Sequence, residues 1–328
     1  MIKIAFFDAK NYDKEVFNKH NKDYNYEITY FESKLNSETA HLTKGFDVVC
    51  IFVNDKADAE TLKILEENGV KVLALRCAGF NNVDVENRGK LKVVRVPQYS
   101  PYAVAEHAVG LLLCINRKLY KSYQRTRKYN FSLDGLLGFD IHGKTVGVIG
   151  TGRIGKAFIN IMKGFGTNII AYDMYKDENF QKEAGFEYVD LDTLYKNADI
   201  ISLHCPLTKE TERMINKDSI SKMKDGVMII NCSRGKLINT DDLVEKLSEG
   251  KIGGVGLDVY EDEEEFFLRD MSNSYVRDKN LSILLSMPNV FITSHQAFFT
   301  REALNKIASD TLENIKEEFE TGTCANEL

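Results

Sequence analysis

A glycine-rich segment near the middle of the chain constrains the fold more than any other feature of the sequence. Residues 146–155 read Val-Gly-Val-Ile-Gly-Thr-Gly-Arg-Ile-Gly, so an apolar run ends in glycines spaced G-x-G-x-x-G. In this pattern Gly150 allows a tight turn out of a strand, Gly152 lets the backbone approach a pyrophosphate, and Gly155 lets the following helix pack close to the sheet. Phosphates then lie at the helix N-terminus, where unpaired N–H groups favour anions. The segment predicts a dinucleotide site.

The next apolar run, residues 169–172, ends in Asp173. An acid at the end of the second strand is placed to accept hydrogen bonds from the ribose hydroxyls of a dinucleotide. Its charge also disfavours a 2′-phosphate, so the pattern predicts NAD as the cofactor. Glycines at this spacing alone also occur in plain tight turns, and the acid at the end of the following strand favours the cofactor site.

Length and charge limit the class of protein. A chain of 328 residues can hold two domains, each with its own core. With 43 basic and 49 acidic residues the net charge is −6, which argues against a general nucleic-acid-binding protein. No apolar run approaches the roughly 18 residues of a membrane span, and residues 1–7 indicate a first strand and no signal peptide. The six cysteines lack metal-ligand spacing, so we expect free thiols, no metal and a cytoplasmic location.

Apolar runs alternate with helical patterns along the chain. In the first hundred residues strands are expected at 2–7, 48–53, 70–75 and 92–96, with a helix at 59–67. Pro101 opens a long helix after Ser100, and Thr300 caps the last helix. From residue 144 the alternation restarts, with apolar runs that end at Ile149, Tyr172, Leu203, Ile230, Val259 and Thr293. We therefore expect an α/β fold with doubly wound parallel sheets.

Polar residues and glycines follow the ends of all six strands in the second half. Open parallel sheets bind ligands outside the carboxyl ends of their strands, so these residues are expected to share one crevice. After Gly150–Gly155 and Asp173 they are, in chain order, His204-Cys-Pro206, Asn231-Cys-Ser-Arg-Gly235, Asp258 with Glu263, and His295. Chance placement explains any one of them but is a poor explanation for the whole set. The crevice is therefore a candidate active site.

Three of these residues suit hydride transfer to a 2-oxo acid. Arg234 offers a forked guanidinium that can bind a carboxylate and polarise the adjacent carbonyl. His295 can donate a proton to the carbonyl oxygen and accept it in the reverse direction, and a neighbouring Glu263 would favour its protonated form. Each has a structural alternative: Arg234 in a surface ion pair, His295 in a structural role, and Glu263 as one of several solvated acids in residues 261–265. His204 is expected to pack on the cofactor side.

The chain resembles the D-isomer-specific 2-hydroxyacid dehydrogenase family, and within it most closely the bacterial fermentative D-lactate dehydrogenases. The resemblance covers essentially the whole chain. It rests on Gly150-Thr-Gly-Arg-Ile-Gly155 and on six further stretches: Leu75-Arg-Cys-Ala-Gly-Phe-Asn-Asn-Val-Asp84, Tyr99-Ser-Pro-Tyr-Ala-Val-Ala-Glu-His107, His204-Cys-Pro206, Asn231-Cys-Ser-Arg-Gly235, Asp258-Val-Tyr-Glu-Asp-Glu263 and Ser294-His-Gln-Ala-Phe298.

The resemblance implies roles for individual residues. Arg234, Glu263 and His295 would be the catalytic residues, with Glu263 selected from its acidic neighbours by its place in Asp-Val-Tyr-Glu-x-Glu. NAD would contact Gly150, Gly152, Arg153, Ile154, Gly155, Asp173, Cys205, Pro206, Thr211, Cys232, Ser233 and Asp258. Backbone amides at Ala78 and Gly79 would bind the substrate carboxylate together with Arg234, and Phe52 and Tyr99 would line the pocket.

The resemblance also implies the domain organisation and the reaction. Residues 1–100 and 299–328 would form a discontinuous catalytic domain, and residues 101–298 the NAD-binding domain, giving two Rossmann-like domains with the active site in the cleft between them. The expected reaction is reversible hydride transfer between NADH and pyruvate, giving D-lactate, in a homo-oligomer (a dimer or tetramer) that binds neither nucleic acid nor membrane.

Two other functions stay open at this point. One is a reductase for larger 2-oxo acids with branched or aromatic side chains, for which the bulk of Phe52, Tyr99 and Tyr102 is the discriminating feature. The other is a non-catalytic, NAD-sensing interaction protein. A sensor needs only the cofactor site, so the joint presence of Arg234, Glu263 and His295 argues against it.

Overall fold

The computed structural model describes residues 1–328 apart from the side chain of Glu265, and the chain folds into two compact units. Unit 1 consists of residues 1–100 together with residues 299–328, and unit 2 consists of residues 101–298. None of the described helices is long and apolar enough to cross a membrane.

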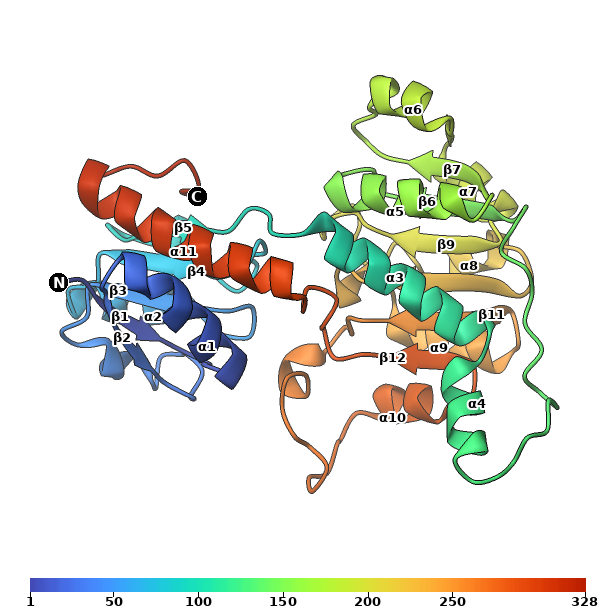
Figure 1. The fold of residues 1–328 in the computed structure, drawn as a ribbon, viewed down its shortest axis with the longest axis horizontal. Coiled ribbons are helices and arrows are strands. Elements are labelled where there is room, and N and C mark those ends of the chain that lie inside the picture. Colours follow the sequence, from blue (N-terminus) through green and yellow to red (C-terminus); the bar gives the residue numbers. More distant parts are fainter. The chain divides into compact units, whose positions relative to one another are not determined.

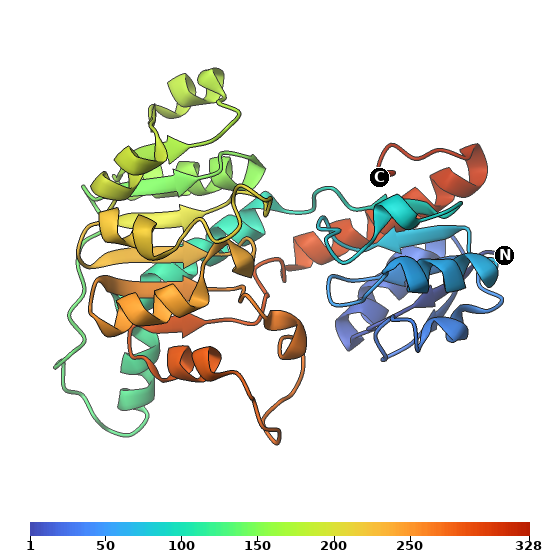
Figure 2. The same cartoon turned by 180° about the vertical axis from the view of Figure 1, so that it is seen from behind.

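Unit 1 is built on a five-stranded parallel sheet in the order β2-β1-β3-β4-β5. Helices α1 and α11 pack together on one face, and α2 covers the other (Figures 1 and 2). The elements are β1 (Lys3–Phe6), α1 (Asn11–His20), β2 (Glu27–Tyr30), β3 (Val48–Ile51), α2 (Ala59–Glu67), β4 (Val72–Leu75), β5 (Lys92–Arg95) and α11 (Arg301–Thr321), with 3₁₀ turns at Asn21–Asp23, Ala40–Thr43 and Val85–Asn87.

Capping side chains mark the starts of two helices in unit 1. Asp58 accepts a hydrogen bond from the amide of Thr61 at the start of α2, and Thr300 accepts one from the amide of Ala303 at the start of α11. Helix α11 is the last in the chain, yet it packs on β4 and β5 from the first hundred residues. Unit 1 is therefore discontinuous in sequence.

Unit 2 holds a seven-stranded parallel sheet in the order β12-β11-β10-β9-β6-β7-β8. Helices α3 and α5 lie on one face, and α7, α8 and α9 lie on the other (Figures 1 and 2). Its strands are β6 (Thr145–Ile149), β7 (Asn168–Tyr172), β8 (Glu187–Tyr188), β9 (Ile200–Leu203), β10 (Val227–Asn231), β11 (Ile252–Leu257) and β12 (Val290–Ile292). Its helices are α3 (Pro101–Asn116), α4 (Leu119–Thr126), α5 (Arg153–Gly164), α6 (Glu178–Ala184), α7 (Leu191–Asn197), α8 (Lys217–Lys222), α9 (Thr240–Ser248) and α10 (Lys279–Ser286), with 3₁₀ turns at Gly235–Leu237 and Glu263–Glu265.

The predicted α/β fold with doubly wound parallel sheets is confirmed. The two strands that the sequence pattern missed, β2 and β8, lie at sheet edges, where one side of the strand is not paired and apolar alternation is weak. Several strand ends were also predicted one or two residues too late. For example, β3 stops at Ile51 and not at residue 53, and β11 stops at Leu257 and not at Val259.

The strand order in unit 2 reverses direction between β6 and β9. At such a switch point the loops after the two strands diverge and leave a crevice for a ligand. The loops that meet here are the glycine-rich segment after β6 and the segment that starts at His204 after β9. The sheet topology thus places the dinucleotide motif where ligands bind in this fold class.

Candidate active site

The glycine-rich loop connects β6 to α5. Gly150 has a positive φ of 95°, and a Cβ there would lie 2.5 Å from the backbone nitrogen of Cys205. A Cβ on Gly155 would overlap the carbonyl oxygen of Gly150. At Gly152, by contrast, no heavy atom lies within 4 Å of the Cβ position. Gly150 and Gly155 are therefore required by packing, while Gly152 leaves open space at the N-terminus of α5 for a phosphate.

Asp173 lies at the end of β7 and is connected to this loop. One of its carboxylate oxygens accepts hydrogen bonds from the Thr151 amide (2.6 Å) and hydroxyl (3.0 Å), and the other accepts one from the Tyr175 amide (2.9 Å). A carboxylate has about four acceptor positions, so capacity remains for ribose hydroxyls. The open space at Gly152 and the acid beside it fit a dinucleotide.

We expect two glycine variants to separate packing from cofactor binding. A Gly155→Ala variant should lose about 1–3 kcal/mol of unfolding free energy, because the added methyl meets the Gly150 carbonyl. A Gly152→Ala variant should keep nearly wild-type stability and bind NADH about tenfold more weakly, because its methyl occupies the phosphate side of the loop. Urea unfolding and NADH fluorescence titration measure the two effects. Equal NADH affinity in Gly152→Ala and wild type would contradict the phosphate assignment.

The remaining predicted cofactor residues line the ends of β9 and β10. Ser233 donates from its hydroxyl to the Cys205 carbonyl (2.7 Å), and the Thr211 hydroxyl donates to the Pro206 carbonyl (2.7 Å), so these loops are joined. Burial raises the pKa of Cys205 to about 11, and burial with the nearby Asp258 charge raises that of Cys232 well above its usual value. Both thiols are therefore neutral and unsuited to nucleophilic chemistry. Arg153 is exposed and Ile154 half-buried in the first turn of α5.

His204 is next to the glycine loop. Its ring packs on Phe158 with centroids 4.8 Å apart, and its Nε2 lies 2.9 Å from the Ser202 hydroxyl. Burial lowers the pKa of His204 to about 3. The imidazole is therefore neutral at physiological pH, which suits packing and not proton donation.

Arg234 follows β10 in the loop that leads to a short 3₁₀ turn. Its side chain is half-buried, and its Nη1 donates to the Ser233 carbonyl (2.8 Å). The Asn231 side chain donates to the Arg234 carbonyl (2.9 Å) and so fixes the backbone of the loop. A Cβ on the next residue, Gly235, would overlap the Tyr260 carbonyl, so only glycine lets this loop pack against the segment that carries Glu263.

Glu263 and His295 form a direct pair. His295 Nδ1 lies 2.6 Å from Glu263 Oε1, and both side chains are largely buried, with 19% and 15% of their surfaces exposed. The other Glu263 oxygen accepts a hydrogen bond from the Tyr260 amide (2.8 Å). His295 has φ 51°, a left-handed conformation that is uncommon outside glycine. With Nδ1 engaged by the acid, the ring is oriented and Nε2 is left to exchange a proton with a ligand.

Asp258 anchors the loop that carries His295. The Asp258 carbonyl accepts from the His295 amide (2.7 Å), and its carboxylate accepts from the amides of Gln296 (2.9 Å) and Ala297 (2.8 Å). The Thr293 hydroxyl donates to the same carboxylate (2.5 Å). Although burial favours the neutral acid, hydrogen bonds from His107 and Thr293 hold the pKa of Asp258 below its usual value. A charged, fully buried Asp258 thus holds the backbone around His295.

Sequence reasoning missed the supporting roles of His107 and Thr293. His107 Nε2 lies 3.0 Å from the Thr293 hydroxyl and 3.3 Å from an Asp258 oxygen, and Thr293 itself binds Asp258. His107 lies on α3, far from Thr293 in sequence, so no local pattern connects them. Thr293 follows β12 and meets Asp258 only in the folded chain, so no local pattern indicated its role.

Four of the five predicted substrate residues lie in unit 1, and the fifth, Arg234, lies in unit 2. Phe52 follows β3, is 8% exposed, and donates its amide to Asp55 (2.6 Å). Ala78 and Gly79 are in the loop after β4, and Tyr99 is half-buried near the end of the first hundred residues. In the strand order of unit 1 the direction of connection reverses between β1 and β3, which makes the loop with Phe52 part of that unit's switch point.

Among the described residues, no group of three or more His, Cys, Asp and Glu side chains is arranged to hold a metal ion. The site brings a guanidinium, an imidazole–carboxylate pair and a dinucleotide-binding loop to one sheet. Fold and site together define a dinucleotide-binding α/β protein with an acid–base pair after the strands of the same sheet.

Comparison with known proteins identifies the family. The sequence profile of the NAD-binding domain of D-isomer specific 2-hydroxyacid dehydrogenases matches residues 109–297. The chain is 47% identical to the D-lactate dehydrogenase of Escherichia coli over 329 aligned residues that cover 100% of both chains. It is 50% identical to 2-hydroxyacid dehydrogenase homolog 1 of Schizosaccharomyces pombe, over 96% of each chain. The chain belongs to the D-isomer specific 2-hydroxyacid dehydrogenase family.

Solved structures agree with this assignment. The apo structure of the E. coli D-lactate dehydrogenase superposes with a TM-score of 0.91 at 46% identity and covers 100% of both chains. A structure from the identification of the pyruvate reductase of Chlamydomonas reinhardtii gives a TM-score of 0.93 at 42% identity, over 99% of this chain and 98% of that chain. The predictions of family, of an oxidoreductase and of NAD as cofactor are confirmed.

Proposed function

We propose that the protein is an NAD-dependent D-lactate dehydrogenase that reduces pyruvate to D-lactate and catalyses the reverse reaction. The observation that carries this proposal is the His295–Glu263 pair, with 2.6 Å between Nδ1 and Oε1, on loops of the NAD-binding unit. Support comes from the E. coli D-lactate dehydrogenase, which matches the chain over its full length.

In the proposed reaction the bound NADH supplies the hydride. Arg234 binds the substrate carboxylate and withdraws electron density from the adjacent carbonyl, which makes that carbon a better hydride acceptor. The protonated His295 donates its Nε2 proton to the carbonyl oxygen as the charge develops there. Glu263 keeps the ring oriented and stabilises its positive charge. In the reverse direction the neutral imidazole accepts the hydroxyl proton.

We assign the substrate carboxylate to the Ala78 and Gly79 amides as well, and the substrate side chain to a pocket lined by Phe52 and Tyr99. We also assign unit 1 the role of catalytic domain and unit 2 that of NAD-binding domain. The bulk of the two aromatic rings favours a small substrate over branched or aromatic 2-oxo acids. A panel of 2-oxo acids at saturating NADH tests this preference. We expect kcat/KM to be highest for pyruvate. A higher kcat/KM for a branched or aromatic 2-oxo acid would show that the larger acid, and not pyruvate, is the preferred substrate.

The cofactor preference follows from Asp173. A 2′-phosphate would meet a carboxylate that already faces the glycine-rich loop, so NADPH should be a much poorer hydride donor than NADH. Initial rates with the two cofactors at equal concentration measure the preference. No turnover with either cofactor would refute the proposed activity and leave the NAD-sensing alternative.

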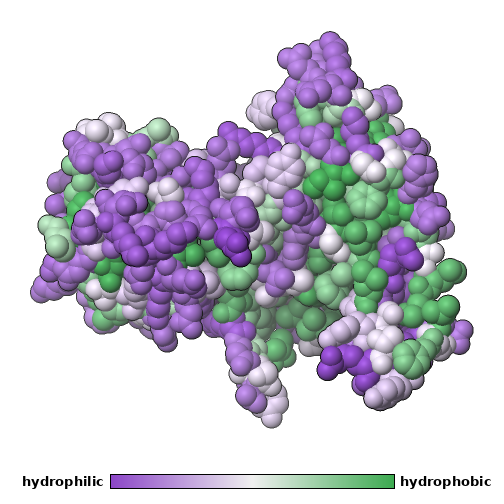
Figure 3. All heavy atoms as spheres, viewed as in Figure 1, coloured by the Kyte–Doolittle hydropathy of each residue, from purple (hydrophilic) through white to green (hydrophobic). Residues whose placement is uncertain are grey.

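We infer that the enzyme is a homo-oligomer that associates through unit 2. Large apolar side chains are exposed along α4 and the loop after it: Leu119 (51%), Tyr123 (62%), Tyr129 (86%), Phe131 (71%), Leu133 (81%) and Leu137 (87%). Figure 3 shows apolar surface over α3 and α4 on the same face. Monomeric proteins rarely expose contiguous apolar surface of this kind, so a second copy is the expected cover.

Association can be tested by light scattering after size exclusion. We expect wild type to elute as a dimer or tetramer, and a Phe131→Ser/Leu137→Ser variant to shift toward the monomer. Leu285, which is 64% exposed on α10, offers a matched control, since Leu285→Ser removes a similar apolar side chain elsewhere. A monomeric wild type would contradict the inference. None of the six described cysteines forms a disulfide, which supports the proposed cytoplasmic location.

A further inference from the structure

In the loop after β4, residues 77–80, the backbone carbonyl groups accept hydrogen bonds from other groups of the chain. The Cys77 carbonyl accepts from the Val96 amide (3.2 Å), and the Ala78 carbonyl accepts from Nη1 of Arg95 (2.8 Å). In the part of the chain that the structure describes, no hydrogen bond uses the amide N–H of Ala78 or Gly79. The Gly79 carbonyl accepts from the Cys77 thiol (3.2 Å) and the Phe80 carbonyl from the Val83 amide (3.0 Å), so all four carbonyls of the loop are engaged while two amide donors are available.

Peptide planarity connects these two observations. The carbonyl of one residue and the N–H of the next belong to the same rigid plane and point in opposite directions. Fixing the Cys77 carbonyl therefore directs the N–H of Ala78, and fixing the Ala78 carbonyl directs the N–H of Gly79. Arg95 holds the second plane, and a charged donor makes a stronger hydrogen bond than a neutral one.

Both the backbone and the guanidinium of Arg95 are fixed by neighbouring residues. It lies on β5, its amide donates to the Asn326 carbonyl (3.1 Å), and its carbonyl accepts from the Asn314 side chain on α11 (2.8 Å). Its guanidinium lies over the Phe80 ring, 5.1 Å from the centroid. The position of Nη1 is thus set by the backbone at one end and by an aromatic ring at the other.

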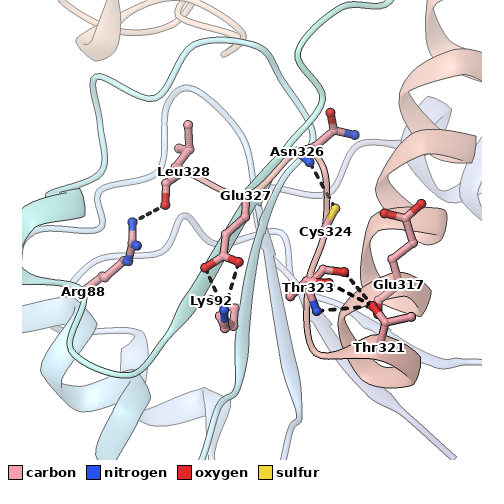
Figure 4. A network of polar contacts seen from close by, with 9 residues as sticks. All are labelled: Arg88, Lys92, Glu317, Thr321, Thr323, Cys324, Asn326, Glu327 and Leu328. Carbon is pink, nitrogen blue, oxygen red and sulfur yellow. Dashed lines mark hydrogen bonds and ion pairs between the residues drawn. The ribbon is translucent and has the colours of Figure 1, made fainter.

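Asn326, which binds the Arg95 amide, belongs to a short segment that we call the strap, Cys324–Leu328. The strap runs antiparallel to β5, with a bridge between Val94 and Glu327 and a hydrogen bond from the Leu328 amide to the Val93 carbonyl (2.9 Å). Lys92 pairs with both Glu327 oxygens at 2.9 Å, and Arg88 donates to the Leu328 carbonyl (Figure 4). The strap therefore covers the outer edge of β5.

We propose that Arg95, held in place by the strap, is a positioning residue for the substrate carboxylate. It acts on the Ala78–Gly79 peptide, so that the Gly79 amide faces the carboxylate of a 2-oxo acid, and it does not touch substrate itself. This inference rests on the proposed function, because it assumes that these amides bind the substrate. It adds Arg95 and Asn326 to the residues on which substrate affinity depends.

The test compares steady-state kinetics of Arg95→Met and Arg95→Lys with wild type. Arg95→Met keeps much of the aliphatic stem and loses the donor, so KM for pyruvate should rise about tenfold or more, with a smaller change in kcat. The NADH dissociation constant should not change, because the cofactor residues lie in unit 2. Arg95→Lys restores a cationic donor and should recover part of the lost affinity.

Lys92→Gln is the matched control. It removes the ion pair with Glu327 and leaves the Arg95–Ala78 hydrogen bond, so its KM should stay close to wild type even where its melting temperature falls. A folded Arg95→Met enzyme with wild-type KM, or one whose NADH affinity falls in parallel, would overturn the inference. If Arg95→Met does not fold, Arg95→Gln and Arg95→Lys are judged by the same KM criterion. An inactive wild type would instead refute the proposed function.

Discussion

An enzyme with His295 replaced by asparagine is expected to reduce 2-oxo acids about 10²–10⁴-fold more slowly than wild type. Asparagine has similar polarity and can keep a hydrogen bond to Glu263, but it cannot donate a proton to the developing alkoxide. Glu263, 2.6 Å away, orients the His295 ring for proton donation. Because proton donation is part of the chemical step, the loss should appear in kcat, while NADH binding stays unchanged. Single-turnover kinetics with preformed enzyme–NADH complex measure the chemical step directly.

Two further variants define the role of the pair. Glu263→Gln keeps a side-chain oxygen near Nδ1 and removes the negative charge, so the positive charge of the proton-donating ring is less stabilised and kcat for pyruvate reduction should fall by about tenfold or more. His142→Asn removes an exposed histidine of the same unit and should leave kcat unchanged. Wild-type kcat in His295→Asn would remove this histidine from the mechanism.

Replacement of Arg234 by glutamine is expected to lower kcat/KM for pyruvate about 10²–10³-fold. The guanidinium provides both a charge for the carboxylate and donors aimed at the carbonyl, so KM should rise and kcat should fall together. Arg234→Lys keeps the charge without the planar fork and should recover only part of the loss. Pyruvate saturation curves at fixed NADH give both constants.

Arg213→Gln is a suitable control for Arg234. Arg213 forms an ion pair with Glu261 at 2.7 Å in the same region of unit 2, and its side chain is 57% exposed. Because the Glu261 side chain is only 9% exposed, this variant should lose some stability, but it leaves Arg234 and its contact with Ser233 in place and should have nearly wild-type kinetics. If Arg234→Gln behaves like Arg213→Gln, Arg234 is a surface residue and the proposed mechanism is wrong.

Most of the central strands could be predicted because they are buried on both faces and therefore appear as continuous apolar runs. Residues 48–51 and 200–203 are of this kind. The edge strand Glu187–Tyr188 has only two residues and no apolar run, so its pairing with β7 depends on tertiary contacts that the sequence does not display. The cap of the last helix was correctly predicted, since Thr300 bonds the amide of Ala303.

The site was predictable as a set of strand-end residues, but its internal geometry was not. Spacing alone did not separate Glu263 from the other acids at residues 261–265. The selection depends on the fold, where the Tyr260 amide holds one Glu263 oxygen and directs the other to His295. The left-handed backbone of His295 and its connection through Asp258 to His107 likewise depend on segments that are distant in sequence.

The measurement that tests the central claim most directly is the configuration of the product formed from pyruvate. Purified enzyme is incubated with NADH and pyruvate, the consumption of NADH is followed by absorbance, and the lactate is resolved by chiral chromatography. The proposed function predicts stoichiometric D-lactate from wild type and a greatly reduced yield from His295→Asn at equal time. L-lactate, a racemic product, or no NADH-dependent lactate from wild type would contradict it.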